Sequence, residues 1–102
     1  MRRCEILLPL RFNDGTPVPD DLIGGVIVTL RERLGAASFE TQTIRGVWLH
    51  EGRAYRDDLA RVFVDVPDAP EHRAWFMAFK ERLKRDFHQL DIWIVTYLIE
   101  VL

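Results

Sequence analysis

The spacing between apolar residues in this 102-residue chain alternates between two, the period of a strand, and three or four, the period of a helix. The order is strand, helix, two strands, helix, strand. This order is the strongest constraint on the fold, because few arrangements bury one side of each of these elements in a single core. The six segments cover residues 4–12, 19–34, 39–49, 54–66, 68–88 and 91–102.

The first helical segment has signals at both ends. Pro19 and the acidic pair Asp20–Asp21 suit the first turn of a helix, and Gly35 is placed to close the helix in a left-handed conformation. The pair Gly24–Gly25 weakens the early turns by about 1 kcal/mol per glycine relative to alanine. Either another segment approaches closely there or the early helix is loose.

The second helical segment has an apolar stripe that continues to about His88. Asp68 and Glu71 have the spacing of a capping box, and Pro70 fits the opening turn. Between the two helices, Gly52 marks a tight reversal that joins the third and fourth segments into a hairpin.

The strand and helix order predicts an α+β fold of the ferredoxin-like βαββαβ type, as one domain over residues 1–102. In this fold a four-stranded antiparallel sheet carries both helices on one face. Pro9 conflicts with the prediction, because it lies in a central strand where proline removes a ladder hydrogen bond. A bulge or a bend is therefore expected at that position.

The closing segment is apolar on both of its sides, whereas an uncovered sheet face normally alternates with polar residues. The patch on the helix-free face would exceed the largest patch of a typical monomer, which is roughly 300–600 Å². We therefore expect a homodimer that covers this open face. The alternative is a bulge that turns these side chains into one core. The residues expected on the open face are Phe63, Trp93, Val95, Tyr97, Ile99 and Val101.

Composition limits the partners. The net charge is −2, so a general attraction to nucleic acid is not expected. No apolar run is long enough to span a bilayer, and the single cysteine, Cys4, suits a reducing compartment, so a cytoplasmic location is expected. The three histidines share no metal-binding spacing, and neither a metal nor a cofactor is predicted.

Polar and aromatic residues gather in the hairpin and after the second helix. An arginine can hold a carboxylate or a phosphate, and a nearby Asp or His can move a proton. The alternative to a binding site is that the hairpin is only a solvated surface with an Arg–Asp ion pair. In that case the side-chain amide of Gln89 only makes hydrogen bonds to the backbone at the start of the last strand. The candidate ligand-binding residues are Arg45, Trp48, His50, Tyr55, Arg56, Asp57 and Gln89.

Three short patterns carry a resemblance: Gly46-x-Trp48, the Arg56-Asp57 pair and Phe87-x-Gln89. They resemble a family of short uncharacterised bacterial proteins with G-x-W, R-E and F-x-Q signatures, in which Glu stands where this chain has Asp57. The resemblance implies a fold rather than an activity. The outline is also similar to dimeric α/β-barrel proteins, which include small monooxygenases and binding modules.

The leading interpretation is a homo-oligomeric binding or structural module. The first alternative is a small cofactor-independent enzyme of the dimeric α/β-barrel type that acts on an anionic small molecule. In it, Arg56 would orient the substrate and His50 or Asp57 would move a proton. The second alternative is a nucleic-acid-binding module, which the third strand disfavours because it lacks the glycine-aromatic signature of RNA-recognition domains.

Overall fold

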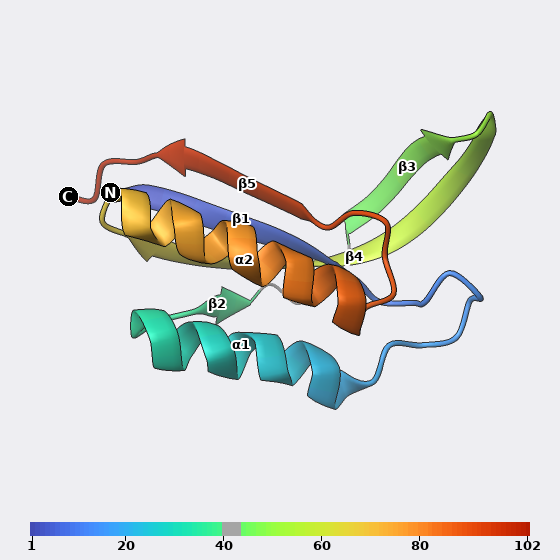
Figure 1. Cartoon of the computed structure of the whole chain (residues 1–102), viewed down its shortest axis with the longest axis horizontal. Coiled ribbons are helices and arrows are strands. Elements are labelled where there is room, and N and C mark those ends of the chain that lie inside the picture. Colours follow the sequence, from blue (N-terminus) through green and yellow to red (C-terminus); the bar gives the residue numbers. More distant parts are fainter. Residues whose placement is uncertain (40–43) are drawn as a thin grey trace.

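The computed structural model describes residues 1–39 and 44–102, and the side chains of residues 39, 44–50 and 53–57 lie outside the described part. Figure 1 shows the two helices running alongside a twisted sheet. No helix in the described ranges is long and apolar enough to cross a membrane. The elements are β1 (Arg2–Pro9), α1 (Asp20–Leu34), β2 (Ser38–Phe39), β3 (Ile44–His50), β4 (Arg53–Val66), α2 (Pro70–Asp86) and β5 (Trp93–Leu98).

The sheet is antiparallel throughout, and β1 lies at its centre between β4 and β5. The strand order is β2-β4-β1-β5, and β3 also pairs with β4. The α+β class and the two helices are confirmed. The sheet has five strands rather than the predicted four, because two separate strands stand where one was expected over residues 39–49. Of these, β2 pairs with Val62 and Phe63, and β3 pairs with residues 53–59.

The hairpin formed by β3 and the first half of β4 extends beyond the rest of the sheet (Figure 1). We call it the hairpin arm, residues 44–59. Its turn consists of Glu51 and Gly52, whose φ angles are 51° and 77°. Positive φ at both central residues defines a type I′ turn, whose twist matches that of the two strands. The predicted reversal at Gly52 is therefore confirmed.

Helix α1 ends where predicted and begins one residue later, at Asp20. Pro19 is its N-cap residue, and two aspartates occupy the first turn. Gly35 closes the helix in a left-handed conformation, with φ 84°, and its N–H donates a hydrogen bond of 2.9 Å to the carbonyl oxygen of Arg31. Within the described ranges, no segment approaches Gly24 or Gly25, since an added Cβ at either position would have no neighbour within 4 Å. Close approach is therefore not the reason for these glycines.

Helix α2 begins without the predicted capping box. Its N-cap is Ala69, and no side chain caps its first amides. Asp68 instead accepts a hydrogen bond of 2.8 Å from Nε of Arg2, at the start of β1. Asp68, which the sequence pattern assigned to the helix cap, is therefore paired with Arg2 instead, and the capping prediction is wrong. The helix ends at Asp86, two residues before the predicted end.

Pro9 needs no bulge, contrary to the prediction. The next residue, Leu10, donates its N–H to the carbonyl oxygen of Asp58 in β4 at 2.8 Å. Neighbouring residues of a strand direct their N–H groups to opposite edges, so position 9 faces the β5 side. On that side, β5 pairs only with Arg2–Leu7. Pro9 therefore lies past the end of that ladder and costs no hydrogen bond.

The core lies between one face of the sheet and both helices. Alternate residues of β1 and β4 point into it, which places the two helices on the same face, as predicted. Its buried residues include Cys4, Ile6, Leu8, Ile23, Val26, Leu30, Val62, Val64, Val66, Phe76, Phe79, Leu83, Phe87 and Ile92.

The last strand is shorter than predicted. It was expected to run to residue 102 but ends at Leu98. The next residue, Ile99, donates its N–H to the carbonyl oxygen of Met1 at 3.0 Å, which holds the two ends of the chain side by side (Figure 1). Ile99 therefore continues the register of the β1–β5 ladder by one residue, whereas Val101 lies beyond it.

Candidate functional site

The residues predicted for a hairpin site lie in the hairpin arm, where the structure gives their backbone register but not their side chains. Trp48 pairs with Tyr55, and Gly46 pairs with Asp57. The remaining candidates, Arg45, His50 and Arg56, also lie in the ladder between β3 and β4. The predicted cleft beside them lies outside the described side chains and stays a prediction.

Gln89 is the one predicted site residue whose side chain is described. Its Nε2 donates to Oδ1 of Asn13 at 3.3 Å and to the carbonyl oxygen of Phe87 at 3.1 Å. Asn13 in turn donates its Nδ2 to the carbonyl oxygen of His88 at 3.3 Å. In this arrangement the amide of Gln89 joins the end of α2 to the turn after β1.

The face of the sheet opposite the helices is formed by alternate residues of three strands. We call it the open sheet face. In the register, Arg3 lies between Asp65 and Tyr97, Glu5 between Phe63 and Val95, and Leu7 between Arg61 and Trp93. No described element covers these residues. The members of the open sheet face are Arg3, Glu5, Leu7, Arg61, Phe63, Asp65, Trp93, Val95 and Tyr97.

Charged residues on the open sheet face pair with one another across the strands. Arg3 holds Asp65 through two bonds, Nε to Oδ1 at 2.8 Å and Nη2 to Oδ2 at 3.0 Å. Glu5 accepts hydrogen bonds from Arg61 and from the hydroxyl of Tyr97. Two arginines and two carboxylates sum to zero charge, so the face is electrically neutral at pH 7.

The two arginines also pack on an aromatic ring. The guanidinium carbons of Arg3 and Arg61 each lie 4.7 Å from the centre of the Phe63 ring. A guanidinium over an aromatic face is attracted by the ring's electrons. Phe63 therefore packs against the arginines of both ion pairs at the centre of the face.

These contacts shift the acidity of both carboxyls. The hydrogen bond from Arg61 is the main cause of the lowered pKa of Glu5, and the hydrogen bond from Arg3 is the main cause of the lowered pKa of Asp65. Burial, by contrast, raises the pKa of the Cys4 thiol in the core, which makes it a poor nucleophile.

The edge of the open sheet face is apolar and exposed. Trp93 is 67% exposed, and its neighbours on β5, Val95 and Tyr97, are about 40% exposed. The prediction that β5 presents apolar side chains away from the helices holds for these three residues, and no bulge turns them into the core. Leu98, expected on the helix side, is exposed at the end of the strand.

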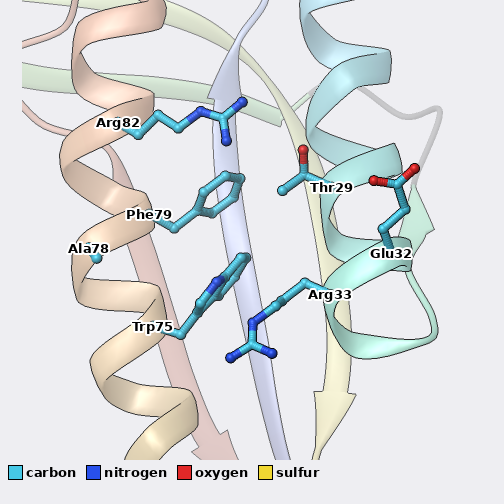
Figure 2. A pocket seen from close by; sticks show the side chains of 7 residues that line it. All are labelled: Thr29, Glu32, Arg33, Trp75, Ala78, Phe79 and Arg82. Atoms are coloured by element: carbon cyan, nitrogen blue, oxygen red, sulfur yellow. The ribbon is translucent and has the colours of Figure 1, made fainter.

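A groove of about 480 Å³ lies between α1 and α2 (Figure 2). Its floor is formed by Trp75 and Phe79, whose rings stack at 4.7 Å, and Arg33 and Arg82 reach in from the two helices (Figure 2). Arg82 is paired with Asp86 at 3.5 Å. Because Glu32 also lines the groove, its charge is mixed and indicates no single ligand class.

A smaller pocket of about 190 Å³ lies between α2 and β5. Its floor includes Cys4, Val66 and Phe76, all buried. We call it the α2–β5 pocket. The residues with ionisable nitrogens that line it are Arg2, His72, Arg73 and Lys80.

Sequence reasoning missed the ion-pair network of the open sheet face. A signal was present, since Arg61, Phe63 and Asp65 alternate with buried valines, and Arg3 and Glu5 flank Cys4. Charged residues at every second position of neighbouring strands lie on one face of the sheet, where opposite charges can form ion pairs with one another. Within the described ranges, no group of three or more metal-ligating side chains comes together.

No profile of a known protein family matches the sequence, and no curated protein matches it. Several solved structures share the fold. A phage SAM lyase in complex with S-methyl-5′-thioadenosine is 17% identical, with a TM-score of 0.72, over 94% of this chain and 79% of that one. The same kind of enzyme in its apo state is 19% identical, with a TM-score of 0.62, over 98% and 92%.

A variant of CutA1 from Pyrococcus horikoshii OT3 is also similar, at 15% identity and a TM-score of 0.64, over 100% of this chain and 86% of that one. At these identities the likeness shows the fold alone. The chain is therefore a ferredoxin-like α+β protein, and its own residues must carry any argument about function.

Proposed function

We propose that this chain is a self-associating binding module whose open sheet face forms the contact between two copies. The observation that carries the proposal is the exposure of Trp93, 67%, on a face that no described element covers. Exposed indole at this level leaves about 100–170 Å² of aromatic surface in water. Tryptophan, tyrosine and arginine are the residues most enriched at the centres of protein interfaces, and all three occur here.

The electrostatics of the face favour a second copy as the partner. Because Arg3 pairs with Asp65 and Arg61 pairs with Glu5, the face carries no net charge that would repel an identical face. Burying charges that are already paired costs far less than burying single ones. A two-fold contact therefore needs no complementary charge from another protein.

The size of the contact is also relevant. A standard interface involves about 20–30 residues on each side, more than the open sheet face provides. The hairpin arm continues from β4 beyond the body of the sheet and is the nearest source of further contact area (Figure 1). A two-stranded ribbon is at best marginally stable alone in water, so contact with a second copy would also stabilise the arm.

The test is the mass of the particle in solution. Sedimentation velocity at about 100 μM should give about 24 kDa, twice the 12.0 kDa of one chain, if the dissociation constant is micromolar or tighter. Trp93→Glu should give the mass of one chain, because it places an unpaired charge within the contact.

The matched control is Leu90→Glu. Leu90 is 64% exposed, close to the exposure of Trp93, but it lies in the loop before β5 and outside the open sheet face. It should leave the mass unchanged. A single-chain mass for the wild type would refute the self-association, and an unchanged mass for Trp93→Glu would refute the contact through the open sheet face.

A second candidate function is the binding of an adenosine thioether. What favours it is that a structural neighbour covering nearly the whole chain was solved with S-methyl-5′-thioadenosine bound. Isothermal titration of the wild type with this compound tests the idea directly. Absence of heat at millimolar ligand, where even weak binding would register, would remove it.

The predicted hairpin residues would hold such a ligand. Because this ligand is uncharged, Arg56, predicted to orient an anionic substrate, would here donate hydrogen bonds to its oxygen or nitrogen atoms, and His50 or Asp57 would hold or move a proton. Arg56→Ala and Asp57→Asn, made separately, should each weaken binding about tenfold with little change in thermal stability. The opposite pattern, with stability lost and binding kept, would leave the hairpin with a structural role.

A further inference from the structure

The α2–β5 pocket has an unusual charge pattern for a protein with a net charge of −2. Four of its lining residues, Arg2, His72, Arg73 and Lys80, carry ionisable nitrogens. Of the described residues that line the pocket, none is acidic. The pocket therefore offers a positive environment in a chain that is negative as a whole.

Two of these four side chains are held in ion pairs. Arg2 is held by Asp68 at 2.8 Å and donates to the hydroxyl of Thr96 at 3.2 Å, and Lys80 pairs with Asp91 at 3.0 Å. In the described part of the chain, no side-chain hydrogen bond or ion pair involves His72 or Arg73. Arg73 is exposed, so its guanidinium is available to an anion.

The start of α2 strengthens this environment. Ala69, the N-cap residue, lines the pocket, and no side chain caps the first amides of this 17-residue helix. The positive end of the helix dipole therefore lies at the pocket, where it favours a negative group. Of the two carboxylates near those amides, Asp68 is held by Arg2, and Glu71 is exposed in the first turn and does not line the pocket.

The floor of the pocket has the opposite character. Cys4, Val66 and Phe76 are buried beneath it, and Ile94 lies on one side. Met77, 55% exposed, stands at its margin and can cover an apolar group with its flexible thioether. A volume of about 190 Å³ is below the roughly 300–1,000 Å³ of sites for drug-sized ligands, so the occupant must be small.

We propose that the α2–β5 pocket binds a small carboxylate with a short apolar tail. The carboxylate pairs with Arg73 near the first turn of α2, and the tail lies against Ile94 and Met77. This site is on the helix side of the sheet, so it is independent of the contact proposed for the open sheet face. It is also too small for an adenosine derivative.

The experiment titrates ¹⁵N-labelled protein with hexanoate and follows the backbone amides by NMR. Shifts should centre on residues 66–80 and 94–96. Two control probes separate the contributions: acetate has the charge without the tail, and hexanol has the tail without the charge. Hexanoate should bind at least about tenfold more tightly than either control, because a charge-assisted contact and apolar burial act together.

Variants locate the anion. Arg73→Ala should weaken hexanoate binding about three- to tenfold, a loss typical of one partly exposed charge-assisted bond. Arg31→Ala is the matched control, since Arg31 is an exposed arginine in the last turn of α1, outside the pocket lining, and it should bind as the wild type does. Both replaced side chains are exposed, so neither variant should lose its fold.

Three results would overturn the proposal: no hexanoate binding to the wild type, equal binding of hexanoate and hexanol, or equal affinity in Arg73→Ala and wild type. Trp93→Glu should keep hexanoate binding even when it abolishes self-association. Failure of the pocket and failure of the dimer can therefore be told apart.

Discussion

Arg3 and Asp65 stand directly opposite each other in neighbouring strands and share two hydrogen bonds, of 2.8 and 3.0 Å, on the face of the sheet that the helices leave uncovered. Their pairing has a consequence for stability in acid. The lowered pKa of Asp65 means that the folded protein holds the ionised form more strongly than the unfolded chain does. The same applies to Glu5.

Stability should therefore fall on acidification. A group whose pKa is lowered by folding stabilises the fold at every pH above its ordinary value, here 3.8 for Asp65 and 4.5 for Glu5. This contribution is lost as the pH falls through those values toward the lower pKa of the folded state. Urea unfolding at neutral pH and at about pH 3 should show the loss, and Asp65→Asn should show a smaller one.

Glu100→Gln is the control for this measurement, because Glu100 is exposed and lies beyond β5. The stability of this variant should fall between neutral pH and about pH 3 by as much as that of the wild type. If Asp65→Asn keeps the full wild-type dependence on pH, the pair with Arg3 contributes nothing to acid sensitivity.

Glycine substitutions in and after α1 should have opposite signs. Gly24→Ala should stabilise the protein by about 0.5–1 kcal/mol, because alanine favours the helix and its Cβ would meet nothing within 4 Å. Gly35→Ala should destabilise by about 1–2 kcal/mol, because its φ of 84° is left-handed. Thermal or urea unfolding measures both, and a shift of the same sign in the two variants would contradict the account of this helix.

The core should respond strongly at its most buried aromatic residue. Phe87 is fully buried among the residues of the sheet and α2, so Phe87→Ala should cost about 3–5 kcal/mol of unfolding free energy. Met77→Ala, on the exposed side of the same helix, should stay within about 0.5 kcal/mol of the wild type. Equal losses in the two variants would show that the packing described here is wrong.

Retention on heparin should be weak. The basic run on α2 is largely neutralised, because Lys80 pairs with Asp91, Arg82 with Asp86, and Lys84 with Glu81. We expect elution below about 0.15 M salt, since three of the four cations in the run Lys80, Arg82, Lys84 and Arg85 are already held in ion pairs. Elution above about 0.3 M salt would instead support the nucleic-acid alternative.

The sequence predicted what depends on local signals. The limits of α1 follow from Pro19 and Gly35, and the hairpin turn follows from Gly52, since these residues act on the backbone within a few positions. The exposed side of β5 followed from the apolar residues at every second position. Such features need no knowledge of what lies across the fold.

The errors concern partners that are far apart in the chain. Asp68 and Glu71 satisfied a capping pattern, but Arg2 lies 66 positions away in sequence and took the carboxylate. Pro9 looked disruptive because the end of the β1–β5 ladder could not be placed from sequence. The α2–β5 pocket was missed for the same reason, because its cations come from β1 and α2 and meet only in the folded chain.

The central position of β1 also determines when the protein can fold. Both of its neighbours in the sheet, β4 and β5, come from the second half of the chain, so its ladders close loops of about 50 to 95 residues. During synthesis the first strand stays unpaired on both edges until β4, which ends at Val66, has left the ribosome, and on one edge until residues 93–98 have followed. Until then its apolar residues are exposed, and this is the interval in which a chaperone would be most useful to this protein.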